Sequence, residues 1–71
     1  MASRYRGLTR RQVQVLELVG AGYTSDQIGD KLGIWGKTVK NHVSAAMKIL
    51  GAKNRWEAYA ILAKDAPREE G

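Results

Sequence analysis

The chain has 71 residues, a formal net charge of +5, one histidine and no cysteine. A chain this short forms one domain with a small core, because it buries only about 60 % of the surface that its unfolded form exposes. The lack of cysteine excludes disulfides and thiolate metal sites, and one histidine leaves too few ligands for zinc. We therefore expect no metal and no cofactor. The positive charge favours an anionic partner such as nucleic acid.

Membrane and enzyme signals are both missing from the sequence. No apolar run has the length of a bilayer span, and no apolar signal core follows the N-terminal arginines. Paired carboxylates, a phosphate-binding loop and a nucleophile with its base are also absent, so we expect no catalytic residues. These features predict a soluble, cytoplasmic protein that is not an enzyme and does not contact a membrane.

The first helix is expected to begin after Thr9 and to run to about residue 21. Thr9 and Gln12 have the spacing of a capping box, and Leu8 and Val13 have that of a hydrophobic staple. Gly22 can close the helix in the left-handed conformation. The apolar positions of its buried face are Val15, Leu16 and Val19.

A second helix is expected over about residues 25–32, because Thr24 and Gln27 repeat the same capping box. Gly29 costs this helix about 1 kcal/mol relative to alanine, which predicts that another helix backbone approaches closely there. Gly33 ends the helix. Only about three residues then separate it from the next helix, and this spacing is typical of a helix-turn-helix.

The third helix, over about residues 36–50, has two different faces. The apolar stripe consists of Val39, Val43, Ala46, Met47 and Leu50. The opposite side carries Lys37, Lys40, Asn41, Ser44 and Lys48. We expect the first face to pack against the core and the second to face a ligand.

An acid-free stretch surrounds this helix. Between Asp30 and Glu57 there is no carboxylate but there are six cations: Lys31, Lys37, Lys40, Lys48, Lys53 and Arg55. A partner lined by phosphates explains this distribution most simply.

The fourth helix, over about residues 55–64, begins after an Asn54–Glu57 cap and is apolar on two sides. One side consists of Ala58, Tyr59 and Leu62. The other consists of Trp56, Ala60 and Ala63 and is flanked by Ile61. A small monomer cannot cover both sides, so we expect a homodimer through this helix, with Trp56, Ala60, Ile61 and Ala63 in its interface.

A set of residues spread over about residues 8–62 resembles the LuxR-type (GerE-like) DNA-binding domain in order and spacing. The set comprises Leu8, Thr9, Arg11, Val15, Leu16, Gly22, Thr24, Ile28, Leu32, Ile34, Lys37, Thr38, Val39, Lys40, His42, Val43, Leu50, Gly51, Arg55 and Ala58. The resemblance implies an all-α, four-helix fold whose second and third helices form the helix-turn-helix. It also implies that the third helix enters the major groove of double-stranded DNA and that the fourth pairs two copies on a roughly palindromic site.

The resemblance also assigns roles to residues. Those that look toward base edges are Lys40, Asn41 and Ser44. Those near phosphates are Lys37, Thr38 and His42, to which we add Lys48 and Arg11 as expected phosphate contacts. One departure concerns Trp35, which stands where the family usually has a capping serine or threonine. Either Gly36 caps the third helix, or packing of the indole and DNA phosphate on the free N–H groups hold its first turn. We expect the indole to pack; the alternative is that it contacts the sugar–phosphate backbone.

We therefore expect a basic arm over residues 1–7, a helix-turn-helix domain over 8–64 and a flexible tail over 65–71. The predicted function is sequence-specific, DNA-binding transcription regulation by a protein that associates with the bacterial nucleoid when bound. The alternative is a protein-interaction adaptor or antagonist that binds a related regulator through the fourth helix, although the acid-free stretch argues against it. No small-molecule ligand is expected within the chain, and it is either a stand-alone regulator or a domain of a larger protein.

Overall fold

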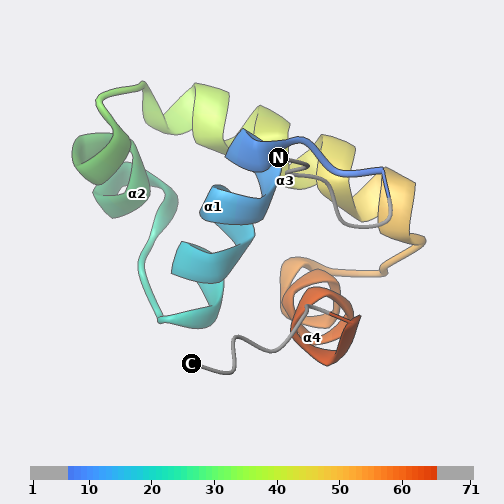
Figure 1. Cartoon of the computed structure of the whole chain (residues 1–71). Coiled ribbons are helices and arrows are strands. Elements are labelled where there is room, and N and C mark those ends of the chain that lie inside the picture. Colours follow the sequence, from blue (N-terminus) through green and yellow to red (C-terminus); the bar gives the residue numbers. More distant parts are fainter. Residues whose placement is uncertain (1–6, 66–71) are drawn as a thin grey trace.

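Four helices make up the fold in the computed structural model, which describes residues 7–65 (Figure 1). They are α1 (Arg10–Gly20), α2 (Ser25–Leu32), α3 (Gly36–Leu50) and α4 (Arg55–Asp65). No strand occurs within this part of the chain. The all-α, four-helix prediction is thus confirmed, and α4 extends one residue beyond its expected end. The arm and the tail expected at the chain ends fall almost entirely outside the described residues.

Side-chain caps determine where α1 and α2 begin. The backbone N–H of Gln12 donates to the Thr9 hydroxyl oxygen at 3.1 Å, and the Gln12 side-chain oxygen accepts from the Thr9 N–H at 2.8 Å. Thr24 and Gln27 make the same reciprocal pair at 3.1 and 2.9 Å. Both capping boxes are therefore confirmed, and each satisfies two backbone groups that a helix start leaves without partners.

The last helix uses a variant of this cap. The Glu57 N–H donates to the Asn54 side-chain oxygen at 2.8 Å, as predicted. The Glu57 carboxylate, however, accepts from the backbone N–H of Lys53 at 2.5 Å rather than from that of Asn54. This bond ties the loop before α4 to the first turn of the helix.

The hydrophobic core lies between α1 and the other helices. Within residues 7–65, α1 contacts each of the other three helices, whereas α2 and α4 lie at opposite ends of α3 and do not touch (Figure 1). One cluster of buried side chains consists of Leu8, Val13, Leu16, Ala46, Ala58 and Leu62. The other consists of Val15, Val19, Ile28, Val39 and Val43. The predicted buried faces of α1 and α3 are thus confirmed.

The two aromatic residues of α4 have different environments. Tyr59 is half-buried, and its ring lies so close to Gly20 of α1 that a Cβ at Gly20 would collide with it. Trp56, by contrast, is 54 % exposed. Of the two, only Tyr59 helps to join α4 to the core.

Candidate nucleic-acid interface

The turn between α2 and α3 is held by backbone contacts. Gly33 has a φ of 73°, in the left-handed region that glycine adopts readily, and it ends α2. The Ile34 N–H then donates to the Gly29 carbonyl oxygen at 2.9 Å. A Cβ at Gly29 would collide with the Ile34 carbonyl oxygen and would lie 3.2 Å from the Gly36 nitrogen. The close approach predicted at Gly29 is therefore present, and the approaching backbone is that of the turn and the first residue of α3.

The start of α3 differs from the starts of α1 and α2. Trp35 occupies the N-cap position, with φ −72° and ψ 149°, and its side chain makes no capping hydrogen bond. Gly36 is the first helical residue and therefore does not act as the cap. The prediction that the indole packs is wrong, because the Trp35 side chain is 80 % exposed. The inward position in the turn is taken by Ile34, which is half-buried against the core.

The outer surface of α3 carries the predicted polar residues. We call this surface the exposed face of α3; its residues Lys37, Lys40, Asn41, Ser44 and Lys48 are all exposed. Thr38 and His42 are half-buried at its edge. The first turn of α3 contains no acidic residue. Arg11 is half-buried and belongs to α1, so it is not part of the exposed face of α3.

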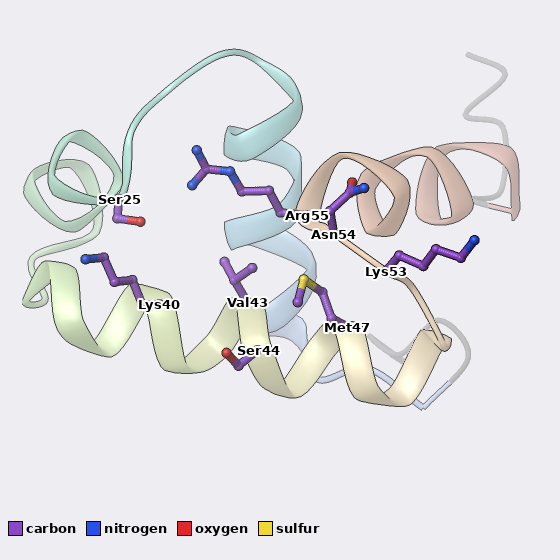
Figure 2. Close-up of a pocket in the computed structure, with 8 residues that line it drawn as sticks. All are labelled: Ser25, Lys40, Val43, Ser44, Met47, Lys53, Asn54 and Arg55. Carbon is purple, nitrogen blue, oxygen red and sulfur yellow. The ribbon is translucent and has the colours of Figure 1, made fainter.

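A concavity of about 500 Å³ lies beside this face, between the starts of α2 and α4 (Figure 2). We call it the α3 pocket. It is lined by Ser25, Lys40, Val43, Ser44, Met47, Lys53, Asn54 and Arg55. Lys40, Val43 and Met47 rise from α3 toward this space, and Arg55 points into it from α4 in the direction of α2 (Figure 2). The lining includes three cations and no carboxylate.

Two of these cations, Lys53 and Arg55, were not among the contacts predicted from the sequence. Lys53 belongs to the loop before α4 and Arg55 is the first residue of α4, yet both line the same pocket as Lys40 and Ser44. The Lys53 side chain extends away from Lys40, whereas that of Arg55 extends toward α2 (Figure 2). The Arg55 guanidinium carbon also lies 5.5 Å from the centroid of the Trp56 ring, a distance at which a cation–π interaction is favourable. The acid-free stretch, which extends to Arg55, was the signal in the sequence that pointed to them.

The outward side of α4 is accessible in the monomer. Trp56, Ala60 and Ala63 are exposed, and Ile61 is half-buried. These are the residues expected in a dimer interface, and that assignment stays a prediction.

Other kinds of site find little support in the described residues. Between residues 7 and 65, no three His, Cys, Asp or Glu side chains gather where they could hold a metal ion. None of α1 to α4 combines the length and the apolar character that a membrane span requires.

The geometry defines a class of protein. A short helix, a tight turn and a longer helix with one buried and one cationic exposed face form a helix-turn-helix, the arrangement with which many DNA-binding domains present a recognition helix. The pocket beside that helix adds further cations.

Comparisons with known proteins agree with this class. Residues 6–62 match the family described as bacterial regulatory proteins, luxR family. The chain is 45 % identical over 51 residues to the transcriptional regulatory protein DegU of Brevibacillus brevis, a match that covers 72 % of this chain and 22 % of DegU. It is 41 % identical over 51 residues to the HTH-type transcriptional regulator MalT of Yersinia pestis (strain Pestoides F), covering 72 % of this chain and 6 % of MalT.

A solved structure also resembles the fold. The structure of the transcription factor GerE matches with a TM-score of 0.79 and 33 % sequence identity, covering 86 % of this chain and 90 % of GerE. The chain therefore belongs to the LuxR family of bacterial regulatory proteins, as its sequence pattern indicated, and it is a DNA-binding regulatory domain of the helix-turn-helix type. It spans less than a quarter of the length of DegU and of MalT.

Proposed function

We propose that this chain is a sequence-specific DNA-binding domain that regulates transcription by placing α3 in the major groove of double-stranded DNA. The observation that supports this proposal best is the exposed face of α3, which carries three lysines, an asparagine and a serine and no acid. An α-helix fits the major groove, where each base pair presents a distinct pattern of donors and acceptors.

The side chains of this face would have two different tasks. Lys40, Asn41 and Ser44 would contact base edges, since lysine donates well to guanine and an asparagine amide can pair with adenine through two hydrogen bonds. Other side chains would contact phosphates, which supply affinity without reading sequence. These are Lys37, Thr38, His42, Lys48 and Arg11.

The α3 pocket supports two additional phosphate contacts, Lys53 and Arg55. Both line the same concavity as Lys40, and no carboxylate is in this lining, so a DNA strand that passes the exposed face would meet their positive charge. Their contribution would be sequence-independent and would weaken as salt concentration rises.

Dimerisation would allow two copies of the chain to bind the two halves of one DNA site. The outward side of α4 exposes Trp56, Ala60 and Ala63, and pairing two copies there would place two recognition helices on a roughly palindromic sequence. Such a dimer would act in the cytoplasm, on the nucleoid.

Selection of binding sites from a pool of random duplexes tests this function. The wild-type chain should enrich a motif with two related half-sites, and binding to it should be tighter than to random duplexes at the same salt concentration. Binding without any enriched motif, equal on all duplexes, would contradict sequence-specific regulation. If the chain bound no duplex but captured a related regulator through α4, an adaptor function would replace the proposal.

A further inference from the structure

Trp35 is the most exposed large hydrophobic side chain among the described residues. Its exposed fraction is 80 %, compared with 54 % for Trp56 and 46 % for Ile49. Single exposed hydrophobic side chains are common on proteins. The case for a role of Trp35 therefore rests on the backbone that holds it and on the charges around it.

The backbone on both sides of Trp35 is anchored. Before it, the Ile34 N–H donates to the Gly29 carbonyl oxygen at 2.9 Å; after it, the Val39 N–H donates to the Trp35 carbonyl oxygen at 3.1 Å. The turn cannot move toward α2, because Gly29 already lies against the Ile34 carbonyl group. The fold therefore fixes the backbone from which the exposed indole projects, at the N-terminal end of α3.

Charges of both signs lie near the backbone that carries the indole. The next residue, Gly36, has no side chain, and Lys37 after it is exposed. The Asp26 carboxylate lies against Gly36, which disfavours a phosphate on the N–H groups of the first turn. A contact at this end of α3 therefore falls to side chains, namely those of Lys37 and Thr38, proposed above as phosphate contacts, and the exposed Trp35. The indole has an apolar body and one N–H donor, so it can pack on deoxyribose carbons and donate to a phosphate oxygen.

We propose that the Trp35 indole lies against the sugar–phosphate backbone at the edge of the groove that α3 enters, with its Nε1–H donating to a phosphate oxygen. This inference rests on the proposed function. At the N-cap position, where α1 and α2 have a threonine hydroxyl that caps the helix, α3 has this indole. Trp35 therefore provides no side-chain cap for α3 but provides a contact to DNA. Because the contact is to the backbone, it adds affinity and orientation but reads no base.

The variant Trp35→Ser separates this role from folding, because its two effects have opposite signs. Serine can cap α3, so the melting temperature of the free chain should rise. The affinity for DNA should nevertheless fall about tenfold, the loss of one good contact. The probes are the duplex that the wild-type chain enriches and a random-sequence duplex, and both affinities should fall by the same factor. Trp35→Phe, which keeps the apolar ring and loses the N–H, should give an intermediate affinity.

Ile49→Ser is the matched control, since it removes an exposed apolar side chain at the opposite end of α3. Its DNA affinity should equal that of the wild type. Equal affinities of Trp35→Ser and wild type would overturn the indole contact alone, whereas a wild-type chain that binds neither duplex would overturn the proposed function and the contact with it. A change of self-association in sedimentation with unchanged DNA affinity would make Trp35 a protein contact and overturn the proposal.

Discussion

Gly29 is a residue at which α2 lies directly against the turn and the start of α3. The space that a Cβ would occupy there is already taken by the Ile34 carbonyl oxygen, and the Gly36 nitrogen is within 3.2 Å. Both neighbours are backbone atoms, so they cannot rotate away as a side chain would. The absence of a side chain at this position thus allows the tight turn that orients α3.

Gly29→Ala should therefore destabilise the chain, even though alanine favours a helix interior over glycine. The steric cost exceeds the gain in propensity, and we expect a net loss of about 1–2 kcal/mol in the free energy of unfolding. Urea unfolding followed by circular dichroism measures it. Asp30→Ala, at the exposed neighbouring position, is the control and should change stability little. An unchanged or higher urea midpoint for Gly29→Ala would contradict this prediction, because it would show that the turn can move to accommodate a Cβ.

Among the elements, α1 and α2 begin with the same capping box in different environments. The Thr9–Gln12 pair is partly buried, with Gln12 only 9 % exposed, whereas the Thr24–Gln27 pair is exposed. If the threonine is replaced, the backbone N–H that donated to its hydroxyl needs a new acceptor. Water can reach this N–H more easily at the start of α2 than at the start of α1. The two caps should therefore differ in their contribution to stability.

We expect Thr9→Ala to cost about 1–2 kcal/mol and Thr24→Ala about 0.5–1 kcal/mol, because a donor left unpaired is more costly when it is partly buried. Unfolding midpoints of the two variants in urea, measured side by side, give the comparison. The two variants control for each other, since both remove one threonine cap. A larger loss for Thr24→Ala would contradict this account of the caps.

The sequence predicted the helices well because their ends carry chemical signals. Thr9, Thr24 and Asn54 cap three of the four helices, and Gly33 ends α2 where expected. Trp35 was predicted less well, because nothing local in the sequence shows that Ile34 occupies the inward position of the turn. The α3 pocket could not be predicted either, since Ser25, Lys40 and Arg55 meet only through the way α2, α3 and α4 pack.

For the whole molecule, the main question is how two copies would pair. The outward side of α4 is accessible, and Ala60 lies on it without being part of either core cluster. A charge placed there would be solvated in the monomer and buried in the proposed dimer. The position therefore separates folding from assembly.

Ala60→Glu should fold as stably as the wild type and yet bind a full two-half-site duplex at least about tenfold more weakly, because the two half-sites no longer act together. Its affinity for a single half-site should be unchanged in fluorescence anisotropy titrations. Gln14→Glu, which makes the same charge change on an exposed position of α1, is the control for the lower net charge. Tight binding of Ala60→Glu to the full site would argue against pairing through this side of α4.

In the proposed complex, some residues of the exposed face of α3 contact bases and others contact phosphates. The most direct measurement is the affinity of Lys40→Ala and Lys37→Ala for the selected duplex and for a random duplex at one salt concentration. Lys40→Ala should lose about 1–3 kcal/mol more on the selected duplex than on the random one, the value of a well-made base contact. Lys37→Ala should weaken binding to both duplexes alike. Equal losses on the two duplexes for both variants would contradict this division of roles.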